Sequence, residues 1–156
     1  MLEIPEHPGY FALSTGHIRK PNGCITPGTL RPDGYRQICI KYKYYLVHNL
    51  IASAYVFNPR PDIFLCVDHI NGNRSDNVPS NLRYLTNRLN CLNSKASNCS
   101  FYKPTKKWRA YFHKERKFCS LGYYDTKEEA MKIGQAARRD YFEHEYNRLR
   151  NSPIEM

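Results

Sequence analysis

Two stretches, Val67-Asp-His-Ile-Asn-Gly-Asn-Arg-Ser-Asp-Asn77 and Ser80-Asn-Leu-Arg-Tyr-Leu-Thr86, decide which fold this chain is predicted to adopt. The apolar run Phe64–Val67 predicts a strand that leads into the first stretch. Leu82–Leu85 predicts a second strand, and Thr86 is a residue type that caps the N-terminus of a helix. The segment therefore predicts strand, loop, strand and helix in succession.

Four polar residues on these elements have the chemistry of a site that cleaves phosphodiesters. Asp68 offers an anionic oxygen and Asn90, in the predicted helix, a neutral one, and Mg²⁺ prefers such oxygen ligands together with waters and phosphate oxygens. His69 is the candidate general base, because an imidazole with the ordinary pKa of about 6.5 is mostly neutral at pH 7. Asn81 lies in the loop between the strands, where its amide is expected to bond backbone groups and orient the His69 segment.

The order and spacing of these residues resemble the ββα-metal motif of phage-type HNH homing endonucleases. The resemblance implies His69 as general base, Asn81 as the central asparagine, and Asp68 and Asn90 as ligands of Mg²⁺, for which Mn²⁺ can substitute. Many HNH enzymes have histidine at the last motif position, so asparagine there lowers the expected metal affinity. The implied activity is divalent-metal-dependent hydrolysis of double-stranded DNA by a site-preferring, homing-type endonuclease. The alternative is a DNA-binding regulator with a catalytically degenerate HNH fold.

The composition favours a nucleic-acid partner. The chain has 156 residues, with 24 Lys+Arg against 14 Asp+Glu and a net charge of +10, which suits a polyanion better than a small-molecule substrate. No apolar run approaches the roughly 18 residues of a membrane span and no signal peptide is recognised, so we expect a soluble, intracellular protein without a membrane partner. The resemblance implies a phage- or virus-encoded protein that acts in the host cell as a monomer or homodimer. Six cysteines without a C-x-x-C pair predict reduced, mostly buried thiols and no structural zinc.

Residues 1–44 alternate turns with short runs, of which Tyr10–Leu13 and Tyr35–Ile40 predict strands. This segment resembles the small β segment that precedes the nuclease motif in many phage HNH proteins. Two roles stay open for it, packing against the nuclease or contact with the DNA backbone through Arg19, Lys20, Arg36, Lys41 or Lys43. Leu46–Val56 predicts a buried helix, on which His48 is expected to be a hydrogen-bonded core residue rather than a second catalytic histidine.

The pattern changes after a small polar stretch, Asn93–Asn98, which predicts a linker. Three strands are predicted next, at Ser100–Pro104, Trp108–His113 and Lys117–Tyr124. A helix follows to about residue 149, with Thr126 and Glu129 as a capping box and with Ala130, Ile133, Ala137 and Tyr141 as its apolar stripe. This segment resembles the ethylene-response-factor-like (APETALA-type) DNA-binding domain, although the glycine that usually opens that domain is not matched.

Basic and aromatic residues are interleaved on the predicted sheet. A short antiparallel sheet fits the DNA major groove, where cations reach guanine edges and phosphates. The candidate DNA-binding residues are Lys103, Lys106, Lys107, Trp108, Arg109, Tyr111, Lys114, Arg116 and Lys117. The alternative is a charge-rich hairpin that is merely solvated. The whole chain is thus predicted to be α+β, with a small β-rich N-terminal segment (1–44), a ββα-metal HNH nuclease core (45–97) and a C-terminal three-stranded antiparallel sheet plus helix (98–150).

Overall fold

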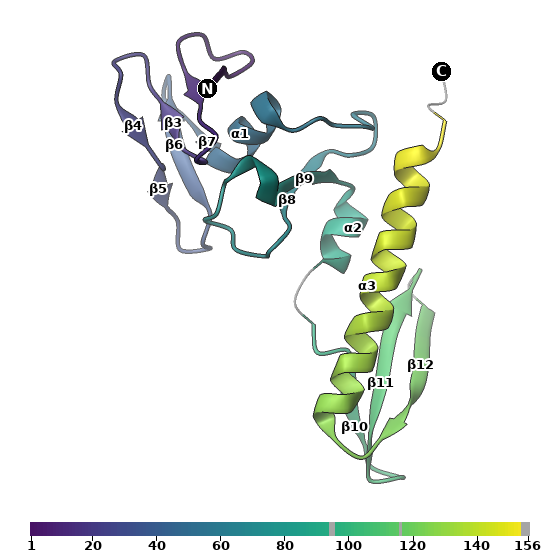
Figure 1. Cartoon of the computed structure of the whole chain (residues 1–156). Helices are drawn as coiled ribbons and strands as arrows, with labels where there is room; N and C mark the ends of the chain where they lie inside the picture. The colour runs from purple at the N-terminus through teal and green to yellow at the C-terminus, as the bar shows by residue number, and fades with distance from the viewer. Residues whose placement is uncertain (94–95, 116, 154–156) are drawn as a thin grey trace. The chain divides into compact units, whose positions relative to one another are not determined.

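The computed structural model describes residues 1–93, 96–115 and 117–153. They form several small antiparallel sheets and a few helices, so the predicted α+β class is confirmed (Figure 1). The chain divides into two compact units, Met1–Asn87 and Arg88–Met156, here called unit 1 and unit 2. The division into the functional segments 1–44, 45–97 and 98–150 stays a prediction, and part of the predicted linker at 93–98 lies outside the described residues.

Unit 1 begins with two antiparallel sheets of short strands, in the orders β1-β2-β3-β4 and β5-β6-β7. The strands are β1 Leu2–Glu3, β2 Phe11–Ala12, β3 Ile18–Arg19, β4 Ile25–Thr26, β5 Thr29–Leu30, β6 Arg36–Ile40 and β7 Lys43–Leu46. The predicted strands Tyr10–Leu13 and Tyr35–Ile40 are found as β2, one residue shorter at each end, and β6, one residue shorter at its start. The reason at β2 is a turn, in which the Tyr10 backbone N–H donates to the His7 carbonyl at 3.1 Å.

Helix α1, Val47–Tyr55, shares one core with these sheets, and the predicted helix is confirmed with one residue fewer at each end. Its buried face includes Val47, Leu50 and Ile51. The sheets and a later strand contribute the rest of the core, which includes Ile4, Ala12, Ile18, Ile38, Ile40 and Leu82. The N-terminal segment therefore packs against the elements that follow it, as one of its two predicted roles requires.

A two-stranded hairpin completes unit 1, with β8 at Cys66–His69 and β9 at Leu82–Leu85, and a 3₁₀ turn, η1 Pro79–Asn81, leads into β9. The position of β9 is as predicted. The prediction for the first strand was two residues early, because pairing with β9 runs from Cys66 opposite Leu85 to His69 opposite Leu82. Phe64 lies before the strand and is fully buried. Both residues of the Asp68-His69 pair therefore belong to the sheet itself. Helix α2, Asn87–Leu92, follows directly after Thr86.

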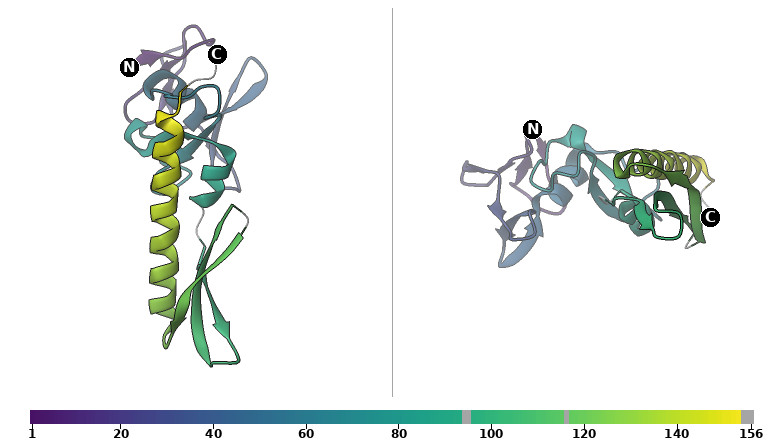
Figure 2. Two further views of the ribbon diagram at one scale, coloured as in Figure 1. Left: turned by 90° about the vertical axis from the view of Figure 1, so that its right-hand side faces the viewer. Right: turned by 90° about the horizontal axis from the view of Figure 1, so that it is seen from below.

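Unit 2 contains a three-stranded antiparallel sheet in the order β10-β11-β12 and a long helix, α3. The strands are β10 Cys99–Tyr102, β11 Lys107–Lys114 and β12 Lys117–Tyr124, and α3 spans Lys127–Asn151. The helix runs along one side of the sheet (Figures 1 and 2), around a small core of Cys99, Ala110 and Ala130. The predicted N-cap is confirmed, since the Thr126 hydroxyl oxygen accepts from the Glu129 backbone N–H at 3.2 Å.

The predicted apolar stripe of α3 was partly wrong. Ile133 is 38% exposed, whereas Gly134 and Phe142 are buried. The reason is a close approach of the chain before β10: a Cβ added to Gly134 would lie 2.3 Å from the Asn98 carbonyl oxygen. Gly134 therefore lies on the buried face of α3 because it has no side chain to obstruct the Asn98 backbone. The spacing of hydrophobic residues does not predict such a position.

The six cysteines are free thiols, as predicted, but the expectation that most are buried was wrong. Only Cys99 is buried, because it alone faces the core between sheet and helix. Within the part of the chain that the structure describes, no helix is both long and apolar enough to span a membrane.

Candidate active site

Asp68 and His69 are the last two residues of strand β8, where Asp68 pairs with Arg83 of β9 and His69 pairs with Leu82. Both side chains are shielded from solvent, with Asp68 8% and His69 4% exposed. The Asp68 carboxylate oxygen Oδ2 accepts from Arg83 Nε at 3.0 Å and forms an ion pair with it. The negative charge of this buried carboxylate is therefore balanced by its cross-strand neighbour, as a buried charge requires.

The imidazole of His69 is held by a residue to which the sequence analysis assigned no role, Asn77. His69 Nε2 lies 2.9 Å from Asn77 Oδ1, and the contact is buried. An amide oxygen only accepts hydrogen bonds, so Nε2 carries the proton of the neutral ring and Nδ1 keeps the lone pair. The Asn77 amide nitrogen has no hydrogen-bond partner among the described residues. Asn77 lies in the same sequence motif as His69, but a separation of eight residues across a loop does not predict that the two side chains are in contact.

Asn81 fastens the loop between the two strands. Its Oδ1 accepts from the Asn71 backbone N–H at 3.0 Å, and its Nδ2 donates to Asn71 Oδ1 at 3.1 Å and to the Asp76 carbonyl at 2.8 Å. These are the contacts that the predicted orienting role requires. The loop is also supported from the N-terminal segment: Gly16, with φ +77°, lies so close that a Cβ would come within 2.6 Å of the Asn77 carbonyl carbon. A larger residue there would displace the backbone that carries Asn77.

A second histidine, His48 of α1, packs against the first. The two imidazole centroids are 5.0 Å apart in an edge-to-face arrangement, and the Tyr35 ring lies 5.0 Å from His48 and 6.0 Å from His69. Arg74 lies over the outer part of this cluster, 4.9 Å from the Tyr35 centroid. Burial, with the neighbouring His69 as a second cause, lowers the pKa of His48 to about 4. His48 is therefore neutral at physiological pH.

The expectation that His48 is a core residue is confirmed by its burial, but the expected hydrogen bond is not found at one ring nitrogen. His48 Nδ1 is buried without a hydrogen-bond partner among the described residues. An unpartnered buried polar atom costs about 1–3 kcal/mol of folding free energy. Burying His48 with this nitrogen unpaired therefore lowers the stability of the folded protein.

The predicted metal ligands are a carboxylate, Asp68, and an amide, Asn90, which is half-buried in α2. No group of three or more His, Cys, Asp or Glu side chains within the described ranges is arranged to hold a metal ion. Asp68 belongs to unit 1 and Asn90 to unit 2, so their joint binding of one cation stays a prediction, and the oxygen donor that each side chain offers suits Mg²⁺.

Comparison with known proteins addresses this segment of the chain. Residues 45–91 match the family model of the HNH endonucleases. The predicted resemblance to HNH endonucleases is thereby confirmed for the stretch that contains α1, the β8–β9 hairpin and most of α2. A solved structure titled "DNA binding and cleavage by the HNH homing endonuclease I-HmuI" is 20% identical to this chain with a TM-score of 0.47, and the alignment covers 82% of this chain and 77% of that one. No curated protein matches the chain.

The candidate DNA-binding residues of unit 2 fall into separate places on its sheet. The lysines lie at the ends of the strands: Lys103 and Lys106 in the turn before β11, Lys107 and Lys114 at the two ends of β11, and Lys117 at the start of β12. Trp108 packs toward the core under α3, whereas Arg109 and Tyr111 alternate onto the opposite face. Arg116 lies outside the described residues. The likeness of this unit to the ethylene-response-factor-like domain stays a prediction.

Proposed function

We propose that this protein is a divalent-metal-dependent HNH endonuclease of the site-preferring homing type, which hydrolyses phosphodiester bonds of double-stranded DNA. The observation that carries the proposal is the side-chain contact between His69 and Asn77 at the end of β8, inside the segment that matches the HNH endonucleases. A histidine whose tautomer is fixed beside a carboxylate is equipped to take a proton from water. A scaffold that only binds DNA does not require a general base, which favours the nuclease over the DNA-binding regulator.

His69 acts as the general base in this proposal. Asn77 accepts the Nε2 proton and so leaves Nδ1 as the nitrogen that receives the proton of the attacking water. Asn81 is hydrogen-bonded to Asn71 and Asp76 of the loop, and the ring of His48 packs edge-to-face with the ring of His69. Because His48 stays neutral at working pH, it adds no competing positive charge next to the base.

Asp68 and Asn90 would hold the divalent cation, Mg²⁺ or Mn²⁺. When bound, the cation stabilises negative charge on the phosphate and on the leaving 3′-oxygen, giving 5′-phosphate and 3′-hydroxyl ends. Arg83, which pairs with Asp68 at 3.0 Å, orients the carboxylate.

Incubation with supercoiled plasmid, with and without Mg²⁺, tests this function. We expect open-circle or linear product only with the cation, and a loss of about 10²–10⁴ in rate for His69→Ala with DNA binding retained, since only the proton transfer is removed. His144→Ala, which removes an exposed histidine of unit 2, is the matched control and should cut at the parental rate. A parent that binds DNA but never cuts it would favour the DNA-binding regulator instead.

The segment 98–150 is proposed to hold the duplex through its lysines. Replacing Lys106 and Lys107 by Gln should reduce the dependence of log affinity on log salt by about 0.9 for each lost phosphate contact. If neither Lys106→Gln nor Lys107→Gln changes the slope of log affinity against log salt, the duplex is contacted elsewhere, and the N-terminal segment is the next candidate.

A further inference from the structure

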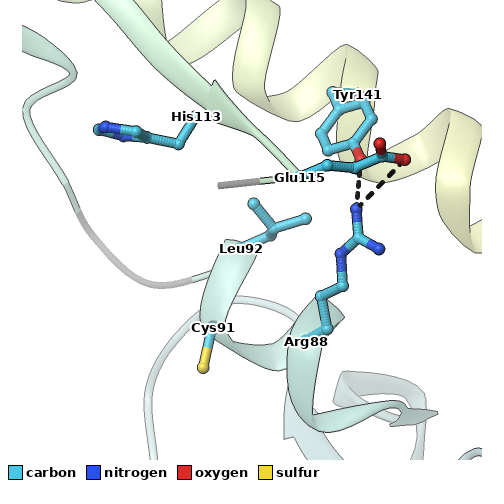
Figure 3. Close-up of a pocket in the computed structure, with 6 residues that line it drawn as sticks. All are labelled: Arg88, Cys91, Leu92, His113, Glu115 and Tyr141. Atoms are coloured by element: carbon cyan, nitrogen blue, oxygen red, sulfur yellow. Dashed lines mark hydrogen bonds and ion pairs between the residues drawn. The ribbon is translucent and has the colours of Figure 1, made fainter. Parts of the chain in front are cut away.

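The sheet of unit 2 has one face covered by α3 and one face that the helix does not cover. Alternation along β11 assigns each of its residues to a face, and Ala110, which shares a small core with Ala130 of α3, marks the covered one. Cross-strand pairing carries the assignment to β10 and β12, where a register shift at Ala110/Tyr111 puts Phe118 and Tyr123 on the same face. The uncovered face carries Tyr102, Arg109, Tyr111, His113, Phe118 and Tyr123, here called the aromatic face. Figure 3 shows the His113 ring directed away from Tyr141 of α3.

The rings of the aromatic face form two clusters. Tyr102 and Tyr123 lie 5.1 Å apart at one end, and Tyr111 is stacked on Phe118 at 5.2 Å toward the other, with His113 5.7 Å beyond. Phe118 is 47% and Tyr123 43% exposed. Large apolar rings gathered at a solvent-facing surface indicate a binding surface, whereas single exposed apolar residues are normal on any protein.

Arg109 joins the two clusters of this face. Its guanidinium carbon lies 5.3 Å from the Tyr102 centroid and 4.7 Å from the Phe118 centroid. Its Nε is buried without a hydrogen-bond partner among the described residues. The cation is thus stacked on rings, the arrangement in which Arg also stacks on nucleobases.

Positive charge lies at one end of the aromatic face. Lys103 and Lys106 occupy the turn between β10 and β11, next to Tyr102, whereas Lys114 at the other end lies on the covered face, with Nζ 5.7 Å from the Tyr141 centroid of α3. Rings that end at a pair of cations are complementary to a strand whose bases are free and whose phosphates lie outside them. A duplex offers no such partner, because its base faces are hidden in the stack.

We propose that the aromatic face binds single-stranded DNA by stacking unpaired bases on Tyr102, Phe118 and Tyr123, while Lys103 and Lys106 contact the phosphates. This inference goes beyond the proposed nuclease, since binding requires neither cleavage nor a metal. DNA is the assigned partner because the same chain carries a segment that matches the HNH endonucleases. Unit 2 would then bind unpaired DNA in addition to the duplex that its lysines are proposed to hold.

The test is a fluorescence-anisotropy titration of the full chain with a labelled oligothymidylate of about 12 nucleotides, in EDTA so that no cleavage occurs. Phe118→Ala and Tyr123→Ala should each weaken binding by about 5- to 150-fold, the equivalent of about 1–3 kcal/mol per stacked base. Affinity for a duplex of the same length should stay unchanged. Phe101→Ala is the matched control, because Phe101 is similarly exposed, at 50%, but lies on the other face beside Trp108.

Phe118→Leu keeps the apolar side chain and removes only the ring, so it should lose affinity like Phe118→Ala while Trp108 fluorescence shows that unit 2 is folded. Equal losses on single strands and duplex, or the same loss in Phe101→Ala, would overturn the proposal. So would a Phe118→Leu protein that is folded and binds normally. Tighter binding of an oligouridylate than of the oligothymidylate would overturn the assignment to DNA. Because all arms are run without metal, a failed plasmid-cleavage assay would leave these results unaffected.

Discussion

His48 makes the stability of unit 1 depend on pH in a way that a single substitution should abolish. In the folded protein burial lowers the pKa of His48 to about 4, against 6.5 in an unfolded chain. Between these values the unfolded chain binds a proton that the folded chain does not, so acid favours unfolding. The stability is complete above about pH 6.5, falls as the pH falls, and levels off below about pH 4. The displacement corresponds to about 3 kcal/mol lost across this window.

His48→Phe keeps an aromatic ring against His69 and Tyr35 but cannot be protonated. We expect the parent to lose about 3 kcal/mol more than His48→Phe between pH 7 and pH 4, because all other titrating groups are common to the two proteins. Leu50→Met is the control, since it changes a buried side chain of the same helix without a titrating group and should shift stability by the same amount at every pH.

The assay must report on unit 1 alone. The single tryptophan, Trp108, lies in unit 2, so its fluorescence does not serve. Hydrogen exchange of the amides in α1, corrected for the intrinsic exchange rate, should show protection in the parent falling about 10²-fold more than in His48→Phe. Parallel stability curves for the two proteins would refute the reasoning, because the buried ring would then not be held neutral by its surroundings.

Three further outcomes are expected. Asn77→Leu should lower the cleavage rate and change its pH profile without weakening DNA binding, because His69 loses the acceptor that fixes its tautomer; an unaltered pH profile would argue against this role. Asn90→Ala should need more Mg²⁺ for activity and be partly rescued by Mn²⁺, as expected when a neutral ligand is lost, and an unchanged metal dependence would remove Asn90 from the site. Gly134→Ala should destabilise unit 2 by about 1–3 kcal/mol, since its Cβ would meet backbone at 2.3 Å, and urea unfolding followed by Trp108 fluorescence would show no change if the helix can shift freely.

Local signals in the sequence predicted the elements well where one residue type has one physical role. Thr126 caps α3 because its hydroxyl reaches the N–H three residues on, and Leu82–Leu85 forms β9 because both of its ends are buried. The first strand of the hairpin was misplaced since a buried apolar residue such as Phe64 fits a strand or the turn before one equally well. Only pairing across the hairpin settles which residues it contains.

The sequence by itself determined the chemistry available to this protein: an Asp-His pair, asparagines at set spacing after it, and a surplus of positive charge. The tertiary structure decided which of these groups meet. The contact of Asn77 with His69, the neighbouring ring of His48, and the gathering of aromatic rings on one face of the unit 2 sheet all depend on register and packing between distant residues. Residue types and local spacing follow from the covalent chain, whereas contacts across loops and strands exist only when a shared core brings those segments together.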